Sequence, residues 1–131
     1  MKIILSILFI FIVSTSTLSA DSDVDLIQLY KELHLNPELS FNEEKTSKKL
    51  ATILSGLGFE VTENFGGYGV VALLKNGEGK TIMLRADMDG LPIEESTGAP
   101  YASKTKSFNQ VGDEVFTMHA CGHDIHMTSL I

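Results

Sequence analysis

Metal-ligating side chains are concentrated in one short stretch near the C-terminal end of the sequence. Residues 119–126 contain the only cysteine and three of the four histidines, with an aspartate among them. Thiolate, imidazole and carboxylate groups bind first-row transition metals. Cys121 and His123 are separated by one glycine, which lets the backbone turn tightly, so both can approach one ion. A buried cysteine beside surface histidines explains the same composition, and the stretch alone does not decide between the two.

A pair of aspartates, Asp87 and Asp89, forms the second candidate element. The short apolar runs 69–74 and 81–84 are typical of strands buried on both faces, and the second run leads directly into these carboxylates. Open α/β sheets build their sites at the carboxyl ends of their strands. A turn-capping role for both aspartates is the alternative interpretation.

Two helices are predicted ahead of these elements. Leu26, Ile27, Tyr30 and Leu33 recur at helical spacing, which predicts a helix over 25–33 capped by Asp23 or Asp25. A second helix has one apolar face, with Asn42 available as its cap and Gly58 suited to its left-handed end. That face consists of Thr46, Leu50, Ile53, Leu54 and Leu57.

The period then changes to that of strands. The predicted strands are residues 59–63, 69–74, 81–84 and 115–118. The turn signal at 76–79 predicts a hairpin of the second strand with the third. Residues 94–114 are expected to form a long connection over the carboxyl edge of the sheet. Asp124 could cap a helix that begins with Ile125.

Residues 1–20 have the pattern of a secretory signal peptide. One positive charge precedes an apolar run over 3–13, and small polar residues follow up to a cut near Ser19 or Ala20. The apolar run is too short to span a bilayer. We therefore expect a secreted or periplasmic product with no stable membrane anchor, and an uncleaved anchor is the alternative.

The charge balance excludes some partners. The chain has 10 basic and 17 acidic residues and a formal net charge of −7. Binding to nucleic acid or to an anionic membrane needs clustered Lys and Arg, so neither is expected as a partner. A single cysteine in an exported chain cannot form an internal disulfide, and the neighbours of Cys121 favour metal ligation.

Four blocks in order carry a resemblance to a known family. They are residues 34–43, 84–93, 97–103 and 118–126. Together they resemble the N-terminal part of the amidohydrolases that include hippurate hydrolase, N-acyl-amino-acid amidohydrolases and plant auxin-conjugate hydrolases. The resemblance implies an α/β fold with a zinc-peptidase-like mixed sheet flanked by helices. Residues 21–131 would be the N-terminal portion of its catalytic domain, and a dimerisation-type domain inserted later would allow a homo-oligomer.

The resemblance also implies roles for individual residues. Cys121 and His123 match the first two metal ligands of the family. The residues assigned to support of the site are Asp87, Asp89, His119, Asp124 and His126. For His119 and His126, hydrogen-bonded support is at least as strong an interpretation as ligation. The general-base glutamate and the remaining ligands of the family lie downstream of this motif, so the segment has no catalytic residue of its own and is expected to be inactive as a truncated product.

For the full-length protein the resemblance implies metal-dependent hydrolysis of the amide bond of an N-acyl amino acid or small peptide. The cofactors would be two divalent ions, chosen from zinc, manganese, cobalt and nickel. Two alternatives stay open. One is a secreted module in which Cys121, His123 and a carboxylate hold a single structural ion, and the other is an inert remnant with an exposed sheet edge.

Overall fold

The computed structural model describes residues 24–131, which contain three helices and two small antiparallel ladders. In chain order the elements are α1 (Leu26–Leu35), α2 (Glu44–Gly56), β1 (Glu60–Phe65), β2 (Gly69–Leu73), β3 (Lys106–Phe108), β4 (Glu114–Phe116) and α3 (His123–Leu130). The predicted α/β class is confirmed. The predicted signal peptide lies outside the described residues. No helix within residues 24–131 is long and apolar enough to cross a membrane.

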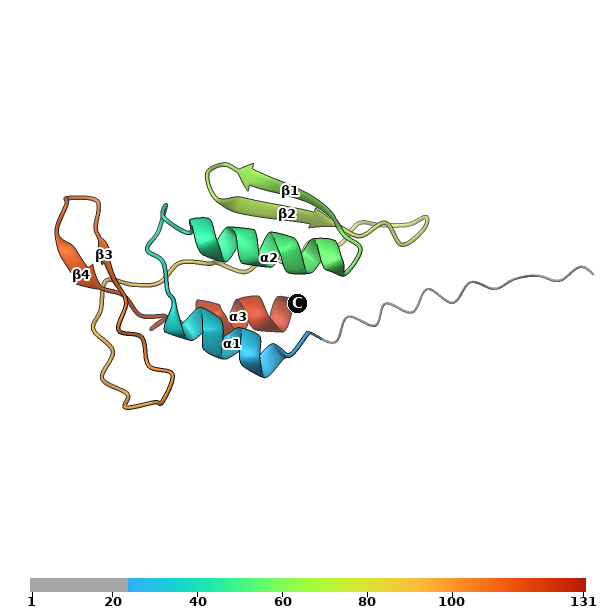
Figure 1. The fold of residues 1–131 in the computed structure, drawn as a ribbon. Coiled ribbons are helices and arrows are strands. Elements are labelled where there is room, and N and C mark those ends of the chain that lie inside the picture. Colours follow the sequence, from blue (N-terminus) through green and yellow to red (C-terminus); the bar gives the residue numbers. More distant parts are fainter. Residues whose placement is uncertain (1–23) are drawn as a thin grey trace, which may run out of the picture.

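The three helices enclose the core. Figure 1 shows α1 and α3 side by side, with α2 between this pair and the β1–β2 hairpin. The buried apolar cluster consists of Leu29, Leu33, Leu50 and Met127, so every helix contributes to it. Full burial of one such side chain is worth about 1.5–3 kcal/mol. Because Met127 belongs to α3, this cluster holds the helix that follows the Cys/His stretch.

The first helix begins and ends as its local sequence indicates. Asp25 is the N-cap, and its carboxylate accepts a hydrogen bond of 2.9 Å from the backbone N–H of Gln28. The helix ends at Leu35, two residues later than predicted, just ahead of Pro37. A residue before proline is pushed out of the helical region, which ends the helix here.

The second helix is capped by a different residue from the one predicted. Asn42 does not cap it; the carboxylate of Glu38 accepts hydrogen bonds from the backbone N–H groups of Thr46 (2.7 Å) and Lys45 (3.2 Å). The chain reverses at Phe41, whose φ is 68°, and this reversal brings Glu38 back to the start of the helix. The prediction failed because the cap comes from a residue remote from the N-cap position.

The end of α2 confirms the role predicted for Gly58. Its φ is 87°, its N–H donates to the carbonyl of Ser55 (3.0 Å), and the N–H of Phe59 donates to the carbonyl of Leu54 (3.1 Å). These are the two hydrogen bonds of a Schellman motif, in which glycine supplies the left-handed residue at no steric cost.

The first hairpin joins different segments from those predicted. β1 pairs with β2 around Gly66 and Gly67, whose φ values are 67° and 116°. The predicted hairpin of 69–74 with 81–84 is wrong, since 81–84 form no strand and Ile82 is 83% exposed. Burial of these runs on both faces is also wrong, because Val71 in β2 is 46% exposed. The shorter connection between β1 and β2 costs less chain entropy to close.

A second hairpin occupies part of the predicted long connection. β3 lies inside residues 94–114 and pairs with β4, which covers the first part of the predicted strand 115–118. The side chain of Asn109 accepts from the N–H groups of Val111 (3.1 Å) and Asp113 (2.9 Å), which closes the turn. A three-residue strand has too short a pattern to be detected in the sequence.

Three remote segments meet at Gly90. The N–H of Gly90 donates to the carbonyl of Glu38 (2.6 Å), and Leu91 and Met118 exchange two backbone hydrogen bonds of 2.8 and 3.0 Å. A Cβ at residue 90 would lie 2.8 Å from the Cβ of Pro37, so only glycine fits without displacement. This seam places residues 87–89 beside the chain that enters the Cys/His stretch.

Candidate metal centre

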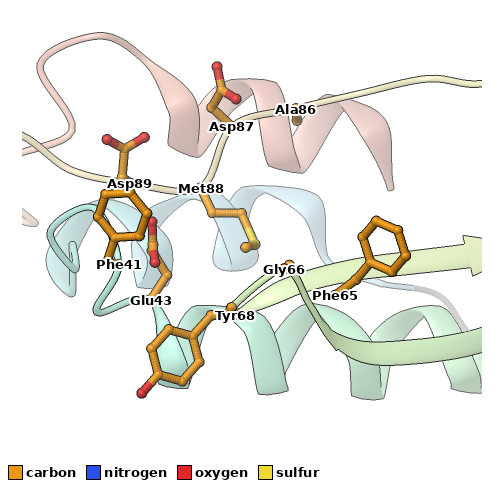
Figure 2. A pocket seen from close by; sticks show the side chains of 11 residues that line it. Phe41, Glu43, Phe65, Gly66, Tyr68, Ala86, Asp87, Met88 and Asp89 are labelled. Carbon is orange, nitrogen blue, oxygen red and sulfur yellow. The ribbon is translucent and has the colours of Figure 1, made fainter.

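The aspartates are presented by an extended segment whose side chains alternate. Figure 2 shows Asp87 and Asp89 on one side of the segment and Met88 on the other, pointing toward Gly66. Met88 and Ala86 pack against the core cluster. In an extended chain, successive side chains point to opposite sides. Anchoring of the two apolar residues in the core therefore directs both carboxylates away from it.

The Cys/His stretch ends in a tight turn that starts α3. Gly122 is the N-cap and has a φ of 79°, which confirms the expected turn between Cys121 and His123. The predicted helix start is wrong, because α3 begins at His123 and not at Ile125. Asp124 is therefore inside the helix, only 2% exposed, and its Oδ1 accepts from the N–H of Ile125 at 2.8 Å.

The imidazole of His123 is oriented by Asp89. Its Nδ1 lies 2.9 Å from the backbone carbonyl oxygen of Asp89 and 3.0 Å from Oδ1 of the same residue. Both oxygens only accept hydrogen bonds, so Nδ1 carries the proton. In neutral imidazole this leaves the Nε2 lone pair free, and Nε2 lies 4.0 Å from Oδ2 of Asp87. An oxygen partner at one ring nitrogen commonly orients a metal-ligating histidine.

Asp89 is itself held in a charged state. Its carboxylate accepts a hydrogen bond from the hydroxyl of Ser40. Burial by itself would raise the pKa of Asp89, but the hydrogen bond from Ser40 and the proximity of His123 outweigh burial and lower the pKa. Asp89 thus remains an acceptor for His123 over the neutral pH range.

The other residues of the stretch have different surroundings. Cys121 is an exposed free thiol, and His126 is exposed with its ring centroid 6.0 Å from that of His123. His119 is only 4% exposed, and within residues 24–131 neither of its ring nitrogens has a hydrogen-bond partner. Burial lowers the pKa of His119, which favours a neutral imidazole with one available lone pair.

An open hollow of about 280 Å³ lies beside the two aspartates. Its walls come from the loop before α2, from the β1–β2 turn and from the extended segment, and include Phe41, Glu43, Phe65, Asp87 and Asp89 (Figure 2). The hollow therefore brings carboxylates and aromatic rings to one surface.

These donors suit a divalent transition metal but do not complete its coordination. Cys121 supplies a soft thiol, His123 has a suitable tautomer, and Asp87 lies near its free nitrogen. No group of three or more His, Cys, Asp or Glu side chains in the described part of the chain is arranged to hold an ion. A tetrahedral centre takes about four ligands. A working site therefore needs donors in addition to those described.

From the sequence no role was assigned to His34, a buried residue whose side chain contacts the start of α3. His34, on α1, binds both Asp124 and Glu95. His34 lies in the first block of the resemblance, and Glu95 lies in the region read as an irregular connection. A signal was present, since a histidine follows directly on the buried apolar positions of α1, but its partners are 90 and 61 residues away in the sequence.

Comparisons with known proteins agree with this geometry. Residues 83–131 match the model of "Peptidase family M20/M25/M40". Hippurate hydrolase of Campylobacter jejuni is 48% identical over 101 residues, covering 76% of this chain and 24% of the relative. N-acetyldiaminopimelate deacetylase of Ligilactobacillus salivarius is 42% identical over 106 residues, covering 79% of this chain and 26% of the relative.

A solved structure gives the same result. The crystal structure of a dinuclear metal-binding peptidase of the M20 family from Bacillus subtilis superposes with a TM-score of 0.66 at 40% identity, over 79% of this chain and 27% of that one. The chain thus spans about a quarter of the length of the relatives it matches.

The α/β fold is that of a segment of an M20-type peptidase domain, and the turn between Cys121 and His123 carries the candidate metal ligands. With the matches above, the chain belongs to peptidase family M20/M25/M40. The resemblance noted in the sequence is confirmed.

Proposed function

We propose that the protein containing this chain is a metal-dependent amidohydrolase that cleaves the amide bond of N-acyl amino acids or small peptides. Two relatives support the substrate class by their names, a hippurate hydrolase and an N-acetyldiaminopimelate deacetylase. A structural relative is described as binding two metal ions. The chain spans only about a quarter of these proteins, and the activity proposed is that of the whole protein.

The observation that carries the proposal is the contact of His123 with Asp89. It fixes the tautomer in which Nε2 can ligate a metal, and it comes from a segment 34 residues away in the sequence. Cys121 would be the second protein ligand, and Asp87 would line the same space. A thiolate ligand favours zinc, cobalt or nickel over manganese.

The residues of this chain would bind the metal ion and orient its ligands. A bound divalent ion supplies Lewis-acid polarisation of the carbonyl and a water of lowered pKa. Asp89 keeps the proton on Nδ1 of His123, so that Nε2 stays available. The general base is expected from a glutamate downstream in the family pattern. No residue of the described segment takes that role here.

Metal titration combined with hydrolysis assays tests the proposal. Cobalt or zinc affinity and turnover of an N-benzoyl and an N-acetyl amino acid should both fall in Cys121→Ser and His123→Ala. Asp89→Asn should weaken metal binding by about 10–100-fold, as expected for a residue that orients a ligating histidine. Ser129→Ala, an exposed change on the same helix, is the matched control. Unchanged metal affinity in both ligand variants would show that Cys121 and His123 are not ligands.

We also propose that the protein is exported and cleaved near Ser19 or Ala20. The charge, apolar run and small residues of 1–20 support this. The intact mass of the protein purified from its producing cell should correspond to a chain that begins after one of these residues. A soluble cytoplasmic product that retains residues 1–13 would contradict it.

A further inference from the structure

A buried ionic cluster lies behind the metal-binding turn. Nδ1 of His34, in α1, is 2.6 Å from Oδ2 of Asp124, in α3, and its Nε2 is 3.1 Å from Oε1 of Glu95. The three side chains are 10%, 3% and 0% exposed, respectively. The two ring nitrogens of His34 therefore contact two segments that are remote from it in the sequence, α3 and the loop that contains Glu95.

The contacts determine the charge state of His34. Both partners are carboxylates, which accept hydrogen bonds when ionised, so both ring nitrogens carry protons and the ring is an imidazolium. Burial alone would lower the pKa of His34, but its hydrogen bonds to Glu95 and Asp124 outweigh burial and raise it. Charge-assisted hydrogen bonds of this kind are shorter and stronger than neutral ones.

Asp124 transmits this contact to the turn. It is adjacent to His123 in the first turn of α3, and its backbone carbonyl accepts from the hydroxyl of Thr128 at 2.8 Å. Because a helix turn is rigid, a fixed Asp124 sets the rotation of α3 about its axis and hence the direction of His123. The imidazole of His123 is held from the other side by Asp89.

Glu95 connects the same cluster to the following loop. Its carboxylate accepts from the backbone N–H of Ser103 at 2.5 Å and from the hydroxyl of Thr97. The rings of Tyr30 and Tyr101 lie 5.7 and 5.4 Å from the His34 ring, centroid to centroid, and cover the cluster. His34 thus joins α1, the 95–103 loop and α3.

We propose that His34 is a positioning residue for the metal centre, because its two ionic hydrogen bonds set the orientation of the turn that carries Cys121 and His123. The inference rests on the proposed function, since it assigns a role toward that same site. His34 itself does not touch the ion. Its effect passes through Asp124 and the first turn of α3.

Cobalt binding to the whole protein that contains this chain tests the positioning role of His34. His34→Gln should weaken cobalt affinity by about 10–100-fold and shift the absorption bands of the bound ion, as for other residues that orient ligands. Asp124→Asn should have a similar effect, and the double variant should lose little more than either single one, since the two act as a unit. Where His34→Gln does not fold, Glu95→Gln takes its place with a smaller shift of the same kind.

A stability-matched control separates positioning from simple destabilisation. Leu54→Ala removes a buried side chain of α2 that is outside the cluster holding α3, so it lowers stability without moving the turn. It should leave the cobalt spectrum and affinity as in the wild type. If His34→Gln alters cobalt binding no more than Leu54→Ala does, the positioning role is wrong.

Cys121→Ser in the same assay separates the role of His34 from the proposed metal site itself. Loss of the thiolate-to-cobalt band in Cys121→Ser, together with unchanged binding in His34→Gln, would overturn only the role of His34. Unchanged binding in Cys121→Ser would overturn the proposed metal site, and the inference about His34 with it.

Discussion

Replacement of Gly90 by alanine should destabilise the seam that leads Met118 into the turn between Cys121 and His123. The new Cβ would lie 2.8 Å from the Cβ of Pro37 and 3.3 Å from the carbonyl oxygen of Met118. Carbon atoms pack best at about 3.5–4.0 Å, so the contact with Pro37 is too short by roughly 1 Å. Pro37 is fully buried and its ring is rigid, so relief requires movement of the backbone.

The size of the effect follows from two opposing contributions. Overpacking of a close-packed interior costs about 1–3 kcal/mol. Alanine also restricts the unfolded chain, which offsets about 0.4–1 kcal/mol of that cost. We therefore expect the free energy of unfolding to fall by about 1–2 kcal/mol.

Urea unfolding followed by circular dichroism measures this change. Gly56→Ala is the matched control, because residue 56 ends α2 and a Cβ there meets no atom within 4 Å. Alanine is better than glycine in a helix by about 0.5–1 kcal/mol, so this variant should be more stable than the wild type. Equal unfolding midpoints for Gly90→Ala and Gly56→Ala would refute the steric argument.

Three further predictions concern charge, capping and backbone conformation. Because the pKa of His34 is raised in the folded state, the stabilisation of the fold by protonated His34 is complete below the unfolded pKa of about 6.5 and is lost as pH rises through the folded pKa. Urea midpoints between pH 6 and 9 should therefore fall more steeply in the wild type than in His34→Gln. Parallel slopes for the two proteins would contradict this. Glu38→Ala should lower stability by about 0.5–2 kcal/mol and speed hydrogen exchange at the Thr46 amide. Glu43→Ala changes a position without a side-chain cap bond and should have neither effect. Equal exchange rates at the Thr46 amide in the two variants would exclude Glu38 as the cap. Gly122→Ala forces a left-handed residue at a cost of about 1–2 kcal/mol, so cobalt affinity and the urea midpoint should both decrease, and wild-type values for both would argue against strain at this turn.

Features that depend on neighbouring residues could be predicted from the sequence. Asp25, which caps α1, was one of the two predicted caps, and the left-handed end of α2 at Gly58 was predicted correctly, because each feature is made within one or two helical turns. The tight turn of the Cys-Gly-His stretch depends only on glycine at residue 122. The order of the four blocks was sufficient to identify the family.

The prediction of strand pairing shows where local patterns are insufficient. An apolar run indicates a strand, but not which other run it joins. In this chain the hairpin forms at Gly66 and Gly67, and none forms at the predicted turn 76–79. The choice depends on loop closure and on packing against α2, neither of which the pattern of a single run contains.

The contacts that support the candidate site come from tertiary packing. Asp89 reaches His123 across 34 residues, and His34 reaches Asp124 across 90. Such partners are chosen by where the helices pack, because a hydrogen bond requires its atoms within about 3.2 Å and the spacing of residue types carries no such information. Asp124 illustrates the difference. Its residue type predicted a helix cap, whereas packing of α3 against α1 made it the buried partner of His34.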